Sequence, residues 1–329
     1  MNCSFIASSE RDADMFEIFV DSGANIPAVF VEKYDINVIA FINIVDGRKV
    51  PGFESGLSLE EERARGKEYY DAIRGGAEVK TSLINSEEFR EHFEPVLKEG
   101  KDLLYISLSS NISGTFNAAR IAAEELREEY PEREIRLVDS LNASLAQGIL
   151  AIYARELQDK GYSLTEIADV LAETAHSMNG TFTVDDLKYL ARTGRLHGAT
   201  AVVGNLLKVK PILCGNRDGF IVQHCLKRGR KKSLNALIDF VCDNIVEPEK
   251  QILGIAHADA YEDSLYVMNG IMSRVKVRDF INTSYDFCTG SHVGPDTIAL
   301  FFIGYDRELQ GKLVDENLRV KRIFDMITA

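Results

Sequence analysis

Short apolar segments alternate with amphipathic segments along the first half of the chain, and this alternation restricts the folds that the chain can adopt. The pattern predicts strands at residues 16–20, 37–44, 103–106 and 135–138, and helices at 59–73, after Ser113 and at 144–157. Strand, helix and strand joined by short links form a parallel sheet with right-handed crossovers. We therefore expect an α/β fold with an N-terminal parallel sheet flanked by helices.

Three of these strands are followed by small polar residues, at Asp21-Ser22, Ser109-Ser110 and Asp139-Ser140. In open α/β sheets the carboxyl ends of the strands line the ligand crevice, so this edge of the sheet is the expected binding site. Asp and Ser also form turns by bonding to the backbone that follows them. For Asp21 and Asp139 both interpretations stay open.

The segment Ser109–Thr115 connects an apolar strand to an amphipathic helix and contains the sequence Ser-Ser-Asn-Ile-Ser-Gly-Thr. A helix N-terminus has unpaired N–H groups and a partial positive charge, and hydroxyl side chains add further donors, so the segment is suited to an anion. The alternative is that Ser110 or Ser113 only caps the helix. Because no phosphate-loop lysine follows, the ligand that this segment suggests is smaller than ATP.

After Gly180 the pattern changes to strands and helices in a different order. Strands are predicted at 208–213, 220–223, 251–256 and 297–303, and helices at 185–191, 232–244 and 260–273. This mixture predicts a second, α+β domain. We place the N-terminal α/β domain at residues 1–176 and the C-terminal α+β domain at residues 177–329.

Composition excludes several classes of function. The 329 residues carry a formal net charge of −13, whereas nucleic acids and membrane surfaces bind proteins with a broad basic face. The five cysteines include no Cys-x-x-Cys pair and the six histidines are scattered, so we expect no metal site and no cofactor. Residues 1–15 are charged and lack the apolar core of a signal peptide, and we expect a cytoplasmic protein without stable membrane insertion.

Several segments together resemble the DegV family, which comprises bacterial proteins that hold a fatty acid. The resemblance spans about residues 16–305 and is carried, in the same order as in the family, by residues 20–22, 81–82, 109–119, 138–140, 182–190, 193–196, 206–212, 227–232 and 290–295. It implies a two-domain DegV-like fold with the ligand between the domains. It also implies an apolar tunnel for the tail of a long-chain fatty acid.

The resemblance further implies which residues hold the carboxylate, namely Ser113, Thr81 and His292. The other residues that we assign to the ligand site are their neighbours in these motifs, Ser82, Ser110, Gly114 and Thr115. The glycines and the proline at 290–295 predict a loop that directs the His292 imidazole at the ligand.

The chain departs from the family pattern at two places. Leu83-Ile84 stands where the family has Gln-Pro, and Gly23 stands where it usually has threonine. The first change removes a turn-forming proline beside Thr81, and the second removes a possible hydrogen-bond donor near the sheet edge. The loop after Ser82 is therefore expected to approach the ligand differently from its counterparts.

Other polar residues are assigned to an outer layer or to a partner contact. Asp21 and Ser22 belong to the sheet edge. Arg195 follows Gly194, a predicted left-handed helix end, and is either a simple C-terminal charge or a contact for the histidine or a partner protein. Lys227 and Arg228 begin a basic run that is either a solvated face or a docking surface for an acidic partner.

We expect a carrier rather than an enzyme. In the family that the chain resembles, a separate kinase subunit phosphorylates the bound fatty acid to an acyl phosphate, so no ATP site is expected here. One alternative is a serine hydrolase in which His292 activates Ser113, but the chain lacks a Gly-x-Ser-x-Gly elbow and an identifiable acidic partner for the histidine. Another alternative is a binder of a different small carboxylate or phosphate.

Overall fold

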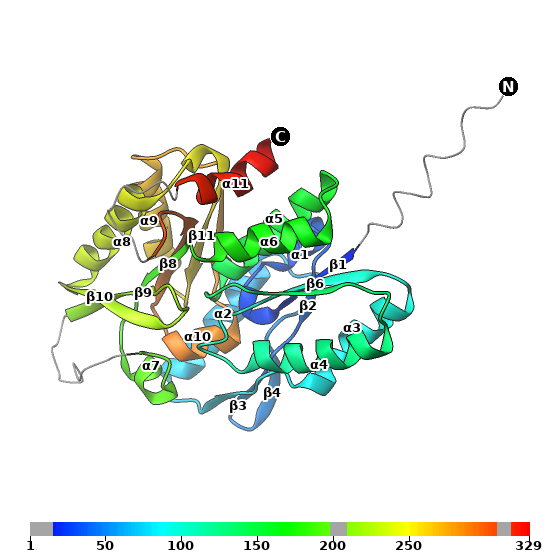
Figure 1. Ribbon diagram of the computed structural model, residues 1–329. Coiled ribbons are helices and arrows are strands. Elements are labelled where there is room, and N and C mark those ends of the chain that lie inside the picture. Colours follow the sequence, from blue (N-terminus) through cyan, green and yellow to red (C-terminus); the bar gives the residue numbers. More distant parts are fainter. Residues whose placement is uncertain (1–15, 198–208, 308–316) are drawn as a thin grey trace.

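A computed structural model describes residues 16–197, 209–307 and 317–329, in which three β-sheets are packed with helices (Figure 1). The first sheet has the order β2-β1-β6-β7 and all of its strands are parallel. Its strands are β1 (Phe16–Asp21), β2 (Asn37–Ile39), β6 (Asp102–Ser107) and β7 (Ile135–Asp139). Asp21, Ser107 and Asp139 therefore end neighbouring strands at one edge, and the predicted pairs Asp21-Ser22, Ser109-Ser110 and Asp139-Ser140 lie at or just beyond these strand ends.

Helices cover both faces of this sheet (Figure 1). The helices that precede β8 in the chain are α1 (Ala28–Lys33), α2 (Leu59–Arg74), α3 (Ser86–Lys98), α4 (Thr115–Glu129), α5 (Leu145–Asp159) and α6 (Leu164–Ala175). Capping boxes at Ser58, Asn85 and Ser163 start α2, α3 and α6, because each side chain accepts the N–H of a glutamate three residues later. On one face, Phe89 and Phe93 of α3 form a buried cluster with α4 and β6.

The strand predicted at 37–44 is in fact two strands in two different sheets. The break at Ala40–Phe41 is held by Ser22, whose Oγ accepts the N–H of Phe41 at 3.0 Å, while the Phe41 ring is buried. Beyond the break, β3 (Ile42–Val45) pairs with β4 (Arg48–Pro51) and β5 (Val79–Thr81) in a three-stranded antiparallel sheet. This sheet places Thr81 on a strand, opposite Asn43.

The second half forms a mixed six-stranded sheet with the order β10-β9-β8-β13-β11-β12. Its strands are β8 (Met178–Thr183), β9 (Val209–Gly215), β10 (Ile221–Arg228), β11 (Ile252–His257), β12 (Asp279–Ser284) and β13 (Ile298–Ile303). The helices described in this half are α7 (Lys188–Thr193), α8 (Arg230–Asn244), α9 (Tyr261–Met272), α10 (Phe287–Val293) and α11 (Asn317–Thr328). Short 3₁₀ helices are formed by η1 (Ser22–Ala24) in the first half and by η2 (Pro248–Lys250) in the second. The predicted α+β character is confirmed, and the basic residues Lys227 and Arg228 lie at the end of edge strand β10.

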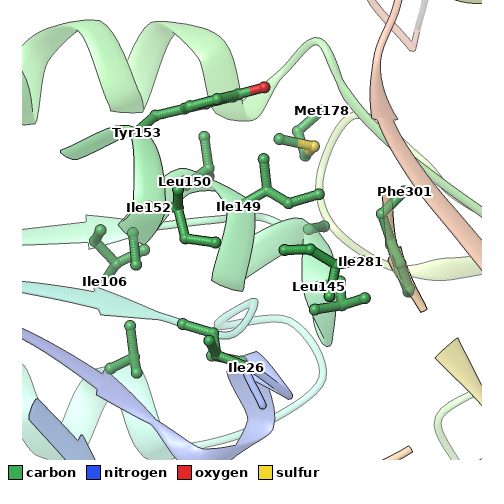
Figure 2. Close-up of a cluster of buried hydrophobic side chains, with 14 of the residues drawn as sticks. Ile26, Ile106, Leu145, Ile149, Leu150, Ile152, Tyr153, Met178, Ile281 and Phe301 are labelled. Atoms are coloured by element: carbon green, nitrogen blue, oxygen red, sulfur yellow. The ribbon is translucent and has the colours of Figure 1, made fainter. Parts of the chain in front are cut away.

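Helix α5 lies between the two large sheets and is apolar on nearly every side. Figure 2 shows its side chains between Ile26 and Ile106 of the first half and Met178 and Phe301 of the second. Such all-round hydrophobicity is typical of a helix in the centre of a protein. Two glycines permit the close approach, since a Cβ on Gly148 would lie 2.6 Å from Ala24 O and a Cβ on Gly254 would lie 2.8 Å from Leu145 Cβ. The two halves thus share one core, and a domain boundary near residue 176 stays a prediction.

The described part of the chain offers neither a membrane-spanning helix nor a cluster of metal ligands. Within residues 16–197, 209–307 and 317–329, no helix is both long enough and apolar enough to cross a bilayer. The same residues contain no group of three or more His, Cys, Asp or Glu side chains that could hold a metal ion.

The carboxylate of Asp21 is fully buried where β1 ends. It accepts hydrogen bonds from Gly23 N at 2.9 Å, Tyr105 Oη at 2.8 Å, Leu108 N at 3.2 Å and Gln147 Nε2 at 3.0 Å. Burial raises the pKa of Asp21 to about 6, although all four of these bonds lower it. The bond from Gly23 also confirms the turn interpretation for Asp21, as the bond from Leu141 N to Asp139 Oδ1 does for Asp139.

We predict that Asp21→Ala lowers the free energy of unfolding by about 3 kcal/mol or more, because it leaves several buried donors unpaired. Urea unfolding followed by circular dichroism measures this change. Since the folded-state pKa is raised, the stabilisation by Asp21 is greatest at low pH and declines as the pH rises through about 6, so the difference from the wild type should shrink over that range. Asp239→Ala, at an exposed ion pair with Arg274, is the control and should cost less than about 1 kcal/mol; equal losses in the two variants would contradict the prediction.

Candidate binding site

A cavity of about 250 Å³ opens where the carboxyl edge of the first sheet meets β8, β9, β13 and α10. Most of its wall is apolar and consists of Phe41, Leu83, Leu108, Ile112, Leu141, Ala143, Phe182, Leu190, Ile221, Val293 and Phe301. An apolar cavity of about 150 Å³ in a protein interior suffices for benzene. The space here is therefore large enough for a longer hydrocarbon group.

Polar side chains gather on another part of the wall and come from segments far apart in the sequence. Thr81 ends β5, Ser113 precedes α4 and His292 lies on α10, and all three line the cavity. Thr81 Oγ1 and His292 Nε2 are 3.2 Å apart and form a hydrogen bond across 211 positions of sequence. Ser82, Gly114 and Arg195 complete the polar lining that the sequence predicts.

Ser113 is positioned by the start of α4. Its Oγ accepts the N–H of Thr115 at 3.2 Å and lies 2.8 Å from Thr115 Oγ1. Gly114 is the N-cap residue and provides no side-chain cap, so the capping alternative holds only in that Ser113 bonds one N–H of the first turn. The first turn of α4 therefore meets the cavity with Ser113 and Gly114 on the wall, which is an arrangement that favours an anion.

His292 lies on a helix, and the prediction of a loop at 290–295 was wrong for this residue. The Asp286 side chain caps α10 by accepting the N–H groups of Cys288 and Thr289. Gly290 serves close packing rather than a turn, because an added Cβ would lie 1.9 Å from the hydroxyl of Tyr70. The helix ends at Gly294, whose φ is +81°.

The His292 imidazole is neutral in this environment. Burial, together with the nearby positive charges of Arg195 and Arg192, lowers its pKa to about 4. Its Nδ1 is buried and has no hydrogen-bond partner among the described residues. A neutral imidazole has one donor and one acceptor nitrogen, so the ring can donate one hydrogen bond to a ligand or accept one from Thr81.

Six of the residues assigned from the sequence lie outside the cavity lining: Ser110, Thr115, Asp21, Ser22, Lys227 and Arg228. Ser110 is exposed, and its N–H donates to the Asp139 carboxylate at 3.3 Å. Thr115 is fully buried against Ser113. Ser22 does not line the cavity itself, but its Oγ accepts the N–H of Phe41, which does. The Gly194 cap that precedes Arg195 is left-handed as predicted, with φ of 70°.

The two departures from the family pattern occupy different places. Leu83 is half exposed at the cavity, where its Cδ2 would lie 3.4 Å from a Cβ on Gly114, whereas Ile84 is buried beside α3 and α4. Gly23 packs tightly, since an added Cβ would lie 2.7 Å from Asp21 Oδ1 and 3.2 Å from Phe41. A larger residue at position 23 would therefore need the adjacent loop to shift.

Sequence reasoning missed part of the polar lining, namely Asn142, Ser144, Tyr285, Cys288 and Thr289. The first two follow β7 and could have been found by extending the argument about the carboxyl edge beyond Asp139-Ser140. The other three lie on the segment that leads from β12 into α10. Their approach to the cavity depends on contacts between the two halves of the chain.

The protein therefore has an α/β fold with a largely apolar cavity that carries hydrogen-bond donors on one part of its wall. The family model described as "Uncharacterised protein, DegV family" matches residues 15–304. A DegV domain-containing protein from Clostridium perfringens is 37% identical over 294 residues, which cover 89% of this chain and 99% of that protein. The chain belongs to the DegV family.

Other relatives have names or titles that state a ligand. A protein from Thermotoga maritima named "Fatty acid-binding protein" is 32% identical over 288 residues, covering 86% of this chain and 95% of that protein. The crystal structure of a fatty acid-binding DegV family protein from Streptococcus agalactiae is similar with a TM-score of 0.75 and 26% identity, covering 88% of this chain and 99% of that chain. The crystal structure of a DegV lipid-binding protein from Thermotoga maritima is similar with a TM-score of 0.76 and 30% identity, covering 89% of this chain and 100% of that chain.

We predict that the His292 ring titrates near pH 4 in the ligand-free protein and at a higher pH when a carboxylate is bound, because an opposite charge favours the imidazolium. NMR titration, with the ring resonances assigned by comparison with His292→Gln, measures both values. The depressed pKa also means that the free energy of unfolding falls as the pH drops from about 6.5 to about 4. If the ring of ligand-free His292 titrates at or above pH 6.5, burial does not lower its pKa and the prediction is wrong.

Proposed function

We propose that this protein binds one long-chain fatty acid in the cavity, with the carboxylate against Ser113, Thr81 and His292. The observation that carries the proposal is the Thr81–His292 hydrogen bond beside Ser113 on the wall of an otherwise largely apolar cavity. Burying a CH₂ group is worth about 0.8 kcal/mol, so a tail of about sixteen carbons gains on the order of 10 kcal/mol before association costs. The polar groups then need only to satisfy and orient the head group.

Each of the three side chains has a distinct part in this proposal. Ser113 is half-buried at the start of α4, so its hydroxyl and the helix N-terminus favour the same negative charge. Thr81 donates either to the carboxylate or to His292. Arg195 lines the same cavity and adds a positive charge near the head group. The fatty acid ligands stated for the relatives in the DegV family support this choice of ligand.

We further propose that the bound fatty acid is presented to a separate kinase subunit in the cytoplasm and phosphorylated there. Lys227 and Arg228 are a candidate docking contact, because they are basic residues at the end of β10, the edge strand of the six-stranded sheet. They lie outside the cavity lining, which separates docking from ligand contact. In this proposal the chain itself needs neither a nucleotide nor another cofactor.

The geometry favours a carrier over a serine hydrolase. His292 Nε2 bonds Thr81, and the Ser113 hydroxyl is engaged with Thr115, so the histidine is not paired with the serine that it would activate. An imidazole with a pKa near 4 is also a weak general base at neutral pH. No observation favours another small carboxylate or a phosphate over a fatty acid.

We predict that the protein purified from cells contains about one fatty acid per chain, because an apolar cavity of this size is favourably filled by hydrocarbon. Native mass spectrometry gives the stoichiometry, and organic extraction under denaturing conditions gives the identity of the ligand. The absence of fatty acid in the extract, together with a failure to bind added palmitate or oleate, would overturn the proposed function.

We predict that Ser113→Ala and His292→Ala each weaken fatty acid binding by roughly ten- to one hundredfold, since a hydrogen bond to a charged group is worth about 1.5–3 kcal/mol. Displacement of a fluorescent fatty acid measures the affinities, and thermal unfolding checks that the variants remain folded. Ser86→Ala at the start of α3 is the control, because Ser86 lies outside the cavity lining.

Two results would contradict this assignment. One is a Ser86→Ala variant that binds as weakly as Ser113→Ala at an equal melting temperature. The other is stoichiometric labelling of Ser113 by a fluorophosphonate probe that is lost in His292→Ala, which would identify an activated nucleophile and favour the hydrolase.

A further inference from the structure

Further polar side chains line the cavity besides the three assigned to the carboxylate. Ser144 is only 1% exposed and lines the cavity. Its Oγ is buried and forms no hydrogen bond with any described residue. A buried hydroxyl without a partner costs about 1–3 kcal/mol, so this side chain calls for a hydrogen-bonding group in the cavity.

Ser144 is also the N-cap residue of α5, which is 15 residues long. Its carbonyl accepts the N–H groups of Gln147 at 3.0 Å and Gly148 at 3.2 Å, and its own N–H donates to Gly23 O at 2.8 Å. No side chain caps the first turn of the helix. The first N–H groups of α5 therefore add a partial positive charge beside the unpaired hydroxyl.

Tyr285 brings a second hydroxyl to the same part of the wall. It is 5% exposed and lines the cavity, and its hydroxyl interacts with the Ser144 side chain without the geometry of a full hydrogen bond. Burial and the charge of Asp286 raise the pKa of Tyr285, whereas the Ser144 hydroxyl lowers it. The net effect is upward, so Tyr285 stays protonated and remains a donor.

In the proposed function the head group of the ligand already has partners other than Ser144. Ser113 follows β6 and Ser144 follows the adjacent strand β7, and Thr81 and His292 are bonded to each other rather than to Ser144. An unsubstituted alkyl chain that passes Ser144 and Tyr285 would leave both hydroxyls without a new partner. An oxygen atom on that chain would accept from both, and where it is a hydroxyl it could also donate to Ser144 Oγ.

We propose that Ser144, Tyr285 and the first turn of α5 form a subsite for an oxygen atom carried on the acyl chain, so that hydroxy or oxo fatty acids are ligands of this protein. This proposal rests on the proposed function of the cavity as a fatty acid site. It adds a second point of polar recognition, which selects the position of the oxygen along the chain. The carboxylate remains with Ser113, Thr81 and His292.

The test compares stearate with a series of monohydroxystearates that differ only in the position of the hydroxyl. Affinities for the delipidated full-length protein are measured by displacement of a fluorescent fatty acid. At least one isomer should bind the wild type as tightly as stearate or more tightly. Ser144→Ala should weaken that isomer about tenfold and leave stearate unchanged, which corresponds to about 1.4 kcal/mol.

Three variants make the test specific. Tyr285→Phe removes only a hydroxyl and should weaken the same isomer. Ser144→Gly suits the φ of 58° at this position and replaces Ser144→Ala if that variant does not fold. Ser233→Ala removes a buried hydroxyl of α8 that lies outside the cavity lining, and it should change neither affinity.

Each remaining outcome overturns a different statement. If every isomer binds the wild type far more weakly than stearate and Ser144→Ala changes nothing, Ser144 is paired with water and the subsite does not exist. If Ser144→Ala weakens stearate as much as Ser113→Ala does, Ser144 belongs to the carboxylate site. If stearate and all of its hydroxy derivatives fail to bind, the fatty acid function is itself wrong, and the subsite is rejected with it.

Discussion

The buried carboxylate of Asp21 is the interaction on which the geometry of the binding site depends. It joins the turn after β1, the strand β6 with the backbone that follows it, and helix α5, through Gly23, Leu108 and Gln147. Ser113 lies in the segment that follows β6, and Ser144 is the N-cap residue of α5. The Asp21 side chain therefore positions two parts of the cavity wall. Few surface contacts could hold three separate loops at one point with comparable precision.

Asp286 has the corresponding part on the other side of the cavity. Its side chain caps α10, which carries His292, and its N–H donates to Asn25 Oδ1 at 2.6 Å, while Asn25 Nδ2 donates to Ser284 O at 2.8 Å. Asn25 belongs to the first half of the chain, so this network fixes α10 relative to the first sheet. Burial and the nearby charge of Asp21 raise the pKa of Asp286 to about 7, although its hydrogen bonds with Thr289 and Cys288 lower it. The two halves are therefore joined by a polar network that is largely removed from water.

Local sequence patterns predicted the features that depend on local physics. The alternation of strands and helices, the polar carboxyl edge of the first sheet and the left-handed Gly194 all follow from periodicity and turn chemistry. The break within 37–44 depends on the bond from Phe41 to Ser22, and the helix around His292 depends on the packing of Gly290 against Tyr70. For the candidate site, the strand-to-helix segment pointed to Ser113, and the resemblance to the DegV family pointed to Thr81 and His292. Ser144 and Tyr285 meet only after both halves have packed, and no short pattern predicts such a meeting.

The position of α5 has a consequence for how the chain is made. During synthesis the helix leaves the ribosome before β8, β11 and β13, and the last of these strands begins only at Ile298. Helix α5 includes Ile149, Leu150 and Ile152, and its other side can already pack against the first sheet at this stage. The side that faces the second sheet stays exposed until β8, β11 and β13 have been synthesised. Nascent chains with such exposed apolar surface are substrates for chaperones and are prone to aggregate. Because the two halves share this core, the chain must be completed before its first half is protected from water.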